Sequence, residues 1–502
     1  MAPSIGKVYL VGGGPGDPGL MTLRGCQCLA RADVVLYDYL VNPQILSHAK
    51  ERAELVCLGR HGRDRIMPQD EINAELVRHA RAGRAVVRLK GGDPVVFAHA
   101  PEEIGALEKA GVPYEIVPGI TAALAVGSYA AIPLTQGDAA SAVALVTGQE
   151  RKDKSLSLDY PALAAFPGTL VFYMGITTAE QWSAQLIAAG KPADTPAAIV
   201  RRCSMPDQQT IVCTLGTVAA EVRSRRLRPP ALVVVGPVAA LAARHGWFVD
   251  RPLVGVRVLV TRAAHQAPAL AAALAELGAD VLVQPAIEIA GPDDWQPVDR
   301  ALQRLSDYDW LVFASANGVR ALLDRLLESR DLRALGHLKL AAIGTSTAEE
   351  LTRYHLRADV VPEEFRAESL AASLRDEAAR GKRFLLARAN RGREVLAEEL
   401  EHNGGRVDQI VVYTSRDVPT ADEQIARQLR AGEIDFVTVT SSAIARSLAH
   451  LFGKALGNSR LASISPVTSA TLAELGYTVA VEADTYTIDG LVEAILAAAK
   501  QR

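Results

Sequence analysis

A glycine- and proline-rich turn near the N-terminus contains the first residues that could do chemistry. The segment GPGDPG at residues 14–19 matches the G-x-G-x-x-G pattern of dinucleotide-binding turns, and Asp38 follows about twenty residues later, where such a site has a ribose-binding acid. However, Pro15 and Pro18 have no N–H group, and a pyrophosphate on this turn needs backbone donors. No Gly-Lys-Ser/Thr sequence follows, so the turn is not a P-loop either. We therefore expect a stiff wall beside an uncharged or cationic group.

Two further turns are expected at the same sheet edge. The segments KGGDP (residues 90–94) and PGITAA (residues 118–123) each follow an apolar run. Gly91 and Gly92 would let a ligand approach the backbone closely, and Asp93 could accept hydrogen bonds from a ribose or an ammonium group. Ordinary strand-to-helix turn chemistry would explain any one of these turns. Because ligands bind at the carboxyl ends of strands in open α/β sheets, we expect the three turns and Asp38 to form one site.

The elements that must position these turns alternate between strands and helices. Residues 8–38 contain an apolar run, the turn, a helix-length segment and a second apolar run that ends at Asp38. A helix is expected at residues 69–82, between Pro68 and Gly83. This alternation predicts a mainly parallel sheet up to about residue 136. Five further apolar runs and two helical segments predict a second α/β lobe at roughly residues 140–240.

A boundary is expected near residues 240–255, and a new α/β pattern follows it. Four later sections combine a strand, a short polar turn and a helix: WLVFASANGVRAL, LAAIGTSTAEEL, FVTVTSSAIARSL and ASISPVTSATLAEL. They indicate an internal repeat whose turns offer hydroxyl groups that cap helices. About ten strands, in two small doubly wound lobes, are predicted. Their positions are residues 256–262, 280–289, 310–315, 340–344, 358–362, 383–388, 408–416, 436–441, 461–465 and 478–483.

The composition is that of a globular, multidomain protein. At 502 residues the chain is expected to hold about three domains. The formal net charge of −3 argues against a dedicated nucleic-acid binder, and apolar runs of about 5–9 residues are too short to cross a membrane. An N-terminus without a signal core predicts a cytoplasmic protein. Five scattered cysteines indicate reduced thiols and no metal site.

Residues 5–245 resemble uroporphyrinogen-III C-methyltransferase, with the family's motifs in order and at the expected spacings. This resemblance implies a tetrapyrrole methylase fold of two α/β lobes, about residues 1–137 and 138–245, with S-adenosylmethionine bound between them. It also implies a homodimer formed through this half. The motifs are VYLVGGGPGDPGLMTLRG, VVLYDYLV, VVRLKGGDPVVF, VPGITAALAVGSYAAIPLTQG, TLVFYMG and ALVVVGPV.

The same resemblance assigns a proposed acid–base pair to Asp38 and Arg60. The family commonly has lysine where this chain has Arg60, and arginine does not release a proton near neutral pH. We therefore expect Arg60 to bind a substrate carboxylate. The implied cofactor contacts are Pro15, Gly91, Gly92, Asp93, Val96, Thr121, Ala122, Met174 and Cys203, and Met174 could alternatively be a plain core residue. Arginines that could pair with the many carboxylates of such a substrate are Arg60, Arg63, Arg65, Arg88, Arg201 and Arg202, of which about half are expected to be ordinary surface residues.

Residues 253–500 resemble uroporphyrinogen-III synthase, in the motifs VRVLVTR, FASANGV, AAIGTSTAEEL, FLLARANRGREVLAEEL, VVYTSR, TVTSSAIARSL and SPVTSATLAELG. The resemblance implies two lobes joined by two strands, with an inner lobe near residues 290–412. We place a linker at residues 246–254 and this domain at residues 255–502. The implied reaction closes hydroxymethylbilane while inverting its last ring, with loss of water.

That reaction needs a weak acid near the departing hydroxyl group, and Tyr413 matches the tyrosine proposed for this role in the family. Turn residues could bind substrate carboxylates through hydroxyl groups and helix-start amides, although each alone is more often a helix cap. These candidates are Arg262, Ser315, Asn317, Thr345, Thr347, Ser441, Ser442, Thr468 and Ser469, with Arg388 and Arg391 as further anchors.

Together the two resemblances predict a bifunctional enzyme that makes uroporphyrinogen III and methylates it twice, giving precorrin-2. The chain contains no separate dinucleotide-binding module, so it is not expected to oxidise precorrin-2 or to insert a metal. One alternative assigns the methyltransferase to a later corrin intermediate. Another makes the C-terminal half a non-catalytic ligand sensor. The sequence is compatible with siroheme, cobalamin or another compound as the end product.

Overall fold

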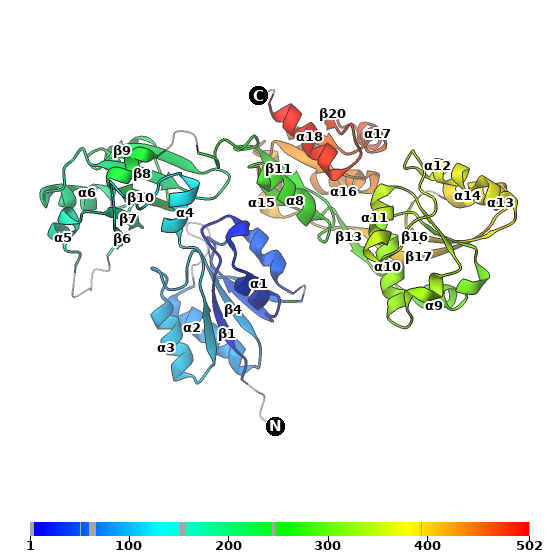
Figure 1. The fold of residues 1–502 in the computed structure, drawn as a ribbon, viewed down its shortest axis with the longest axis horizontal. Coiled ribbons are helices and arrows are strands. Elements are labelled where there is room, and N and C mark those ends of the chain that lie inside the picture. Colours follow the sequence, from blue (N-terminus) through cyan, green and yellow to red (C-terminus); the bar gives the residue numbers. More distant parts are fainter. Residues whose placement is uncertain are drawn as a thin grey trace. The chain divides into compact units, whose positions relative to one another are not determined.

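The computed structural model describes residues 5–50, 52–59, 67–150, 157–242, 246–392 and 394–500. The chain divides into two compact units, Met1–Gly255 with Leu277–Asp280, and Val256–Glu276 with Val281–Arg502. Helices and strands alternate through both units, which confirms the predicted α/β fold class (Figure 1). Among the described residues, no helix is long and apolar enough to cross a membrane.

The first sheet of the N-terminal unit has the strand order β3-β2-β4-β1-β5 and is wholly parallel, where a mainly parallel sheet was predicted. Its central strand β4 has all five residues buried. The strands are β1 (Val8–Gly12), β2 (Val34–Tyr37), β3 (Glu54–Cys57), β4 (Val86–Lys90) and β5 (Tyr114–Val117), and the helices that follow them are α1 (Leu23–Leu29), α2 (Gln69–Arg81), α3 (Ala100–Lys109) and α4 (Ala122–Tyr129).

The second sheet of this unit has the order β6-β7-β10-β8-β9 and is mixed. β6 and β7 are parallel, and the other pairings are antiparallel. Although α4 follows the last strand of the first sheet, it buries Ala123 and Val126 in one cluster with Val171 and Val200 of the second sheet. The elements are β6 (Val143–Thr147), α5 (Tyr160–Ala165), β7 (Thr169–Tyr173), α6 (Ala179–Ala188), β8 (Pro196–Arg201), β9 (Gln209–Thr214), α7 (Val218–Ser224) and β10 (Ala231–Val235).

The C-terminal unit has two five-stranded sheets, of order β12-β11-β18-β19-β20 and β13-β17-β16-β14-β15. The chain enters the second sheet through β13 and leaves it through β17, and these two strands pair antiparallel. The strands are β11 (Arg257–Val260), β12 (Asp280–Val283), β13 (Ile287–Ala290), β14 (Trp310–Phe313), β15 (Lys339–Ala342), β16 (Arg383–Ala389), β17 (Arg406–Asp417), β18 (Phe436–Val439), β19 (Arg460–Ser463) and β20 (Val479–Glu482).

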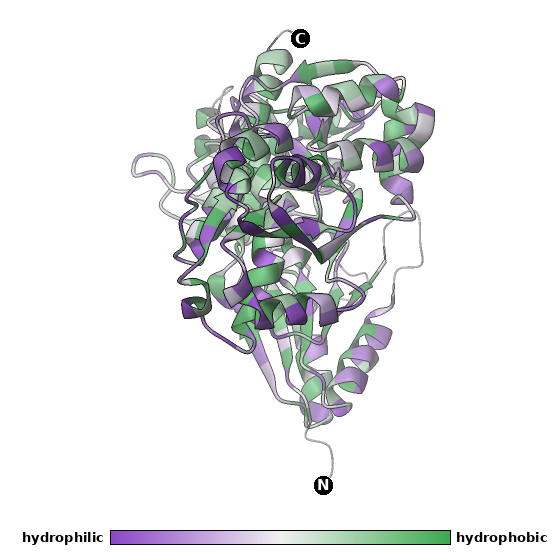
Figure 2. Ribbon diagram, turned by 90° about the vertical axis from the view of Figure 1, so that its right-hand side faces the viewer, coloured by the Kyte–Doolittle hydropathy of each residue, from purple (hydrophilic) through white to green (hydrophobic). Residues whose placement is uncertain are grey.

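Helices cover these sheets with one apolar face each, and in Figure 2 the helices accordingly carry both hydrophobic and hydrophilic residues. Buried leucines on α10, such as Leu322 and Leu326, pack in one cluster with Phe313 of β14. The helices of this unit are α8 (Ala267–Glu276), α9 (Gln296–Gln303), α10 (Ala316–Leu327), α11 (Thr345–Arg353), α12 (Ala367–Ser373), α13 (Arg375–Ala379), α14 (Val395–His402), α15 (Glu423–Arg430), α16 (Ser442–Phe452), α17 (Pro466–Glu474) and α18 (Ile488–Ala499).

Two strand predictions were wrong in this unit. Residues 280–289 form two strands in different sheets, because Pro285 lies between them and a proline cannot donate to a strand ladder. Residues 358–362, which end at Pro362, form no strand. They contribute a single bridge between Ala341 and Val360. The strand–turn–helix pattern predicted for the four similar sections is present in all of them.

Hydroxyl caps begin three of these four helices. Ser315, Ser441 and Ser465 accept hydrogen bonds from the third residue after each of them, at the starts of α10, α16 and α17. The fourth helix, α11, begins after Gly344 and has no side-chain cap. A Cβ atom at Gly344 would lie 3.1 Å from the Phe365 side chain, so the backbone there leaves little room for a capping residue.

Candidate active sites

The structure brings the three glycine-containing turns of the N-terminal unit into direct contact. Gly14 donates its N–H to the Gly92 carbonyl at 3.1 Å, and Gly92 donates its N–H to the Gly14 carbonyl at 2.7 Å. A Cβ atom at Gly119 would lie 2.2 Å from the Gly92 oxygen, and one at Gly12 would lie 2.6 Å from the Gly119 Cα. Only glycine therefore allows the carboxyl ends of β1, β4 and β5 to approach this closely.

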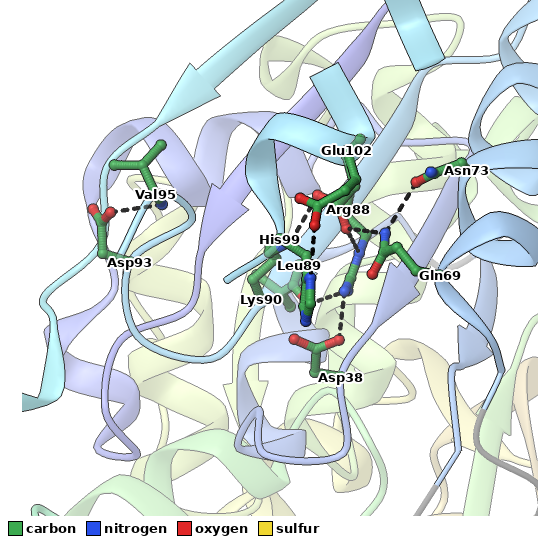
Figure 3. Close-up of polar contacts among 11 residues, drawn as sticks. Asp38, Gln69, Asn73, Arg88, Leu89, Lys90, Asp93, Val95, His99 and Glu102 are labelled. Atoms are coloured by element: carbon green, nitrogen blue, oxygen red, sulfur yellow. Dashed lines mark hydrogen bonds and ion pairs between the residues drawn. The ribbon is translucent and has the colours of Figure 1, made fainter. Parts of the chain in front are cut away.

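Asp93 connects two of these turns through hydrogen bonds to their backbone. One of its carboxylate oxygens accepts the N–H of Val95 at 2.9 Å, and the other accepts the N–H of Gly119 at 3.1 Å. Figure 3 shows the Asp93–Val95 contact. Each oxygen thus already has a backbone partner, so Asp93 shapes the predicted cofactor pocket by fixing the turns at residues 91–95 and 118–122.

Polar residues that contact these turns were missed by sequence reasoning. The Tyr173 hydroxyl is 2.6 Å from the Thr121 hydroxyl and accepts the Ala123 N–H at 2.9 Å, which fixes the start of α4. The Asp17 N–H donates to the Ser204 hydroxyl at 3.0 Å, and the Tyr129 hydroxyl donates to the Asp17 carboxylate at 2.8 Å. In the sequence, two of these residues stand directly beside predicted cofactor contacts: Tyr173 precedes Met174, and Ser204 follows Cys203.

The predicted cofactor contacts near the second sheet are uncharged. Met174 is 47% exposed and has a φ of 52°, so the alternative that it is a core residue is wrong. Cys203 is buried, and burial raises the pKa of its thiol to about 12, which keeps it neutral. The remaining predicted contacts are half-buried and lie on the three turns: Pro15, Gly91, Gly92, Val96, Thr121 and Ala122.

Asp38 lies at the mouth of a buried cluster of charged side chains. Its Oδ1 is 2.6 Å from Arg88 Nη2, and Arg88 Nε donates to Glu103 Oε1 at 2.9 Å. Lys90 Nζ donates to Glu103 Oε2 at 2.7 Å. Burial and the neighbouring Arg88 lower the pKa of the Lys90 ammonium group. The prediction that Arg88 could pair with a substrate carboxylate was wrong, because Arg88 is 3% exposed and both of its anionic partners belong to the chain.

The other arginines predicted to bind substrate carboxylates have different surroundings. Arg202 Nε donates to Asp207 at 2.6 Å, and Arg201 Nη1 lies 4.0 Å from the same carboxylate. Both keep partly exposed side chains beside that single anion. The second member of the predicted acid–base pair, Arg60, lies outside the described residues, as do Arg63 and Arg65.

In the C-terminal unit, the predicted acid Tyr413 is joined to two other predicted site residues. The Tyr413 side chain lies on β17 and is 8% exposed. Its hydroxyl is 3.0 Å from the Ser315 hydroxyl and is also hydrogen-bonded by Asn317. Burial raises the pKa of Tyr413, so the phenol keeps its proton at neutral pH.

A chain of hydrogen bonds connects this tyrosine to the other sheet of the unit. Gln266 Nε2 donates to Asn317 Oδ1 at 2.9 Å, and His265 Nε2 lies 3.2 Å from the same oxygen. Arg262 donates weakly to Gln266 at 3.4 Å, and its buried Nε has no hydrogen-bond partner within the described part of the chain. His265 and Gln266 were missed because they lie one turn after the VRVLVTR motif, at the start of an apolar helix.

The remaining synthase candidates lie on neighbouring turns, and several have partners within the chain. Ser441 caps α16, Ser442 lies 2.8 Å from the Thr471 hydroxyl, and Ser469 donates to Glu482. Thr345 is the first residue of α11, and Thr347 and Thr468 are almost completely buried. Arg388 pairs with Glu394 and Arg391 with Asp417. No cluster of metal-ligating side chains occurs among the residues that the structure describes.

Comparison with known proteins matches each unit to one family. Residues 7–219 match the family of Tetrapyrrole (Corrin/Porphyrin) Methylases, and residues 268–493 match Uroporphyrinogen-III synthase HemD. The fold and the two family matches therefore define a fused enzyme of tetrapyrrole metabolism. The chain belongs to the tetrapyrrole methylase family over its N-terminal half and to the uroporphyrinogen-III synthase family over its C-terminal half.

Individual relatives cover both halves. The porphyrin biosynthesis protein HemD of Ruminiclostridium josui is 33% identical over 438 residues, which is 87% of each chain. A uroporphyrinogen-III C-methyltransferase of Bacillus subtilis is 43% identical over 49% of this chain and 95% of its own. The chain spans about half the length of the siroheme synthases that it matches, such as 53% of the protein from Gluconacetobacter diazotrophicus, at 45% identity. A uroporphyrin-III C-methyltransferase structure from Thermus thermophilus, complexed with S-adenosylhomocysteine, covers 47% of this chain and 100% of its own, at 39% identity and a TM-score of 0.41.

Proposed function

We propose that the chain is a bifunctional enzyme that converts hydroxymethylbilane to precorrin-2. The C-terminal unit closes hydroxymethylbilane to uroporphyrinogen III, with inversion of the last ring and loss of water. The N-terminal unit then methylates uroporphyrinogen III at C2 and C7. Membership of both families supports this order, because one family makes the compound that the other consumes.

The observation that carries the methyltransferase proposal is the contact of three turns at one sheet edge, together with uncharged predicted contacts that follow β7 and β8. A glycine-lined approach and a neutral wall at Pro15, Met174 and Cys203 fit a ligand with a positively charged sulfonium centre, which has no need of anion-binding amides. S-adenosylmethionine, when bound, supplies a methyl group made electrophilic by that centre. The residues that we propose to hold it are Pro15, Gly91, Gly92, Asp93, Val96, Thr121, Ala122, Met174 and Cys203.

We propose that Asp38 accepts the proton that the substrate ring releases when a methyl group is added to it. Asp38 follows β2 at the same sheet edge, and its side chain is 30% exposed, so a substrate can reach it. In-line positioning contributes more to such a transfer than acid–base groups do, so the walls of the pocket carry much of the catalysis. Arg60 would bind a substrate carboxylate, because its guanidinium stays charged.

In the C-terminal unit we propose that Tyr413 donates a proton to the hydroxyl group that leaves as water. Its raised pKa keeps the phenol protonated, and Ser315 and Asn317 hold it in place. Arg262 would bind a substrate carboxylate, since its half-buried guanidinium has no carboxylate partner among the described residues. The further substrate contacts that we propose are Ser315, Asn317, Thr345, Thr347, Ser441, Ser442 and Thr468.

The methyltransferase assignment is tested by supplying uroporphyrinogen III and S-adenosylmethionine under anaerobic conditions. We expect a mass increase of two methyl groups. Failure to methylate uroporphyrinogen III, with turnover of an already methylated corrin, would instead support the later-intermediate alternative.

We also propose a homodimer formed through the methyltransferase half and a cytoplasmic location. Light scattering of the full chain tests the dimer, which a monomeric mass would contradict.

A further inference from the structure

Three charged side chains are buried together beneath Asp38. Arg88, Lys90 and Glu103 are 3%, 2% and 0% exposed. Arg88 and Lys90 are two residues apart on β4 and so point to the same face of the sheet, and Glu103 reaches them from α3. Charged groups are rarely buried this completely, because removing them from water costs more than their pairing usually returns. We therefore expect this buried cluster to have a role besides stability.

The charges of the cluster do not balance without Asp38. Glu103 contacts both cations, with Arg88 Nε at 2.9 Å from one oxygen and Lys90 Nζ at 2.7 Å from the other. One anion therefore serves two buried cations. The second anion is Asp38, whose Oδ1 lies 2.6 Å from Arg88 Nη2. Arg88 bridges a fully buried carboxylate and a partly exposed one, and its planar group holds the two carboxylates in a fixed relation.

Asp38 is also attached to β4 through its backbone. Its N–H donates to the Leu89 carbonyl at 3.1 Å, so both ends of the residue are tied to the strand that carries Arg88. Oδ1 is occupied by Arg88, whereas Oδ2 has no hydrogen-bond partner among the residues that the structure describes. Another contact drawn nearby, His99 Nδ1 at 3.1 Å from Glu102 Oε1, lies at the start of α3 (Figure 3).

We propose that Arg88, held by Glu103, is a positioning residue that orients the Asp38 carboxylate so that Oδ2 accepts the proton from the tetrapyrrole substrate. This inference rests on the proposed methyltransferase function. Arg88 touches neither substrate nor cofactor and acts through Asp38. Lys90 completes the charge balance around Glu103 and so keeps the Arg88 side chain in place.

A double-mutant cycle on the full chain tests the proposal. The variants are Arg88→Met, Asp38→Asn and the double variant, each assayed for kcat and KM with uroporphyrinogen III and for the Kd of S-adenosylmethionine. Arg88→Met leaves Lys90 and Glu103 as a balanced pair and fills most of the arginine volume. We expect each single variant to lose about tenfold to a hundredfold in kcat, and the double variant to lose no more than Asp38→Asn alone. The Kd should stay within about twofold of wild type.

Losses that multiply in the double variant would overturn the proposal, because Arg88 would then act independently of Asp38. A wild-type kcat in Arg88→Met would overturn it as well. If Arg88→Met does not fold, Arg88→Lys replaces it in the same cycle; lysine keeps the charge but lacks the planar group that holds the two carboxylates in a fixed relation, so the same pattern is expected. Arg223→Met, in an exposed ion pair with Glu180, is the matched control and should leave kcat unchanged.

Failure of the proposed function is distinguishable from failure of this inference. A wild-type chain that binds S-adenosylmethionine but does not methylate uroporphyrinogen III would remove the proposed function and, with it, the role of Arg88. An active wild-type chain with multiplicative losses would remove the role of Arg88 alone.

Discussion

Gly14 and Gly92 exchange a pair of backbone hydrogen bonds, at 3.1 and 2.7 Å, and so bind the first turn of the chain to the turn after β4. Gly119 packs against this pair from a third turn, where a Cβ atom would lie 2.2 Å from the Gly92 oxygen. The proposed cofactor pocket would thus be built from backbone groups in close contact, and its shape would depend on the absence of side chains at these positions.

We expect Gly119→Ala to abolish cofactor binding. The added Cβ would overlap a backbone oxygen, which cannot move as a side chain does, so a loss of at least about 1–3 kcal/mol in the free energy of unfolding is also expected. Calorimetric titration with S-adenosylmethionine and urea denaturation measure both effects. Gly105→Ala is the matched control: its Cβ would meet no atom within 4 Å on α3, so stability should rise slightly and binding should not change. A wild-type affinity of Gly119→Ala for S-adenosylmethionine would contradict the proposal that the cofactor pocket lies at these turns.

Asp93→Ala should weaken binding of S-adenosylmethionine by more than about tenfold. Its carboxylate accepts two backbone N–H groups, and a hydrogen bond to a charged group contributes about 1.5–3 kcal/mol. Asp93→Asn should fall between wild type and Asp93→Ala, because the amide offers one acceptor oxygen for the two N–H donors. Calorimetry on the three proteins gives the order, and an unchanged affinity in Asp93→Ala would remove Asp93 from the pocket.

Arg262→Met should raise the KM for hydroxymethylbilane by about tenfold or more without lowering stability. The reason is that the guanidinium is half-buried, burial lowers its pKa, and its Nε has no partner among the described residues, so the folded chain gains little from the charge. Arg333→Met, at a 91% exposed side chain, is the control and should change neither quantity. A large loss of stability with an unchanged KM would show that Arg262 is structural.

Tyr413→Phe should slow ring closure by about tenfold or more and leave methylation of added uroporphyrinogen III unchanged. Since the pKa of Tyr413 is raised by burial, its proton stays on at neutral and mildly alkaline pH. The wild-type rate of ring closure should therefore show no fall from ionisation of this residue between pH 7 and pH 9. A wild-type rate in Tyr413→Phe would exclude the phenol as the acid and would keep open a ligand-sensing role for this half.

The sequence predicted which strand ends meet but not what their charged residues contact. The glycine turns could be placed together because parallel strands end at one edge, and that rule needs only the order of the elements. Arg88 was misjudged because it stands in the strand VVRLK, where alternation alone does not tell a solvent face from a face covered by a helix. Its partner Glu103 is fifteen residues away on α3, a contact set by helix packing.

The same limit explains the residues that were missed. Tyr173 fixes Thr121 across more than fifty positions of sequence, and Gln266 reaches Asn317 across a similar separation. Pairings of this kind depend on how two sheets face each other, which local patterns do not record. By contrast, the serine caps of α10, α16 and α17 are local hydrogen bonds and could be predicted from the turn residues alone.

We propose that one chain both closes and methylates the macrocycle. This proposal is tested most directly by one anaerobic incubation with hydroxymethylbilane and S-adenosylmethionine, followed by mass and isomer analysis of the product. We expect a type III macrocycle that carries two added methyl groups. Unrearranged type I product would contradict the synthase assignment, and unmethylated type III product would contradict the methyltransferase assignment.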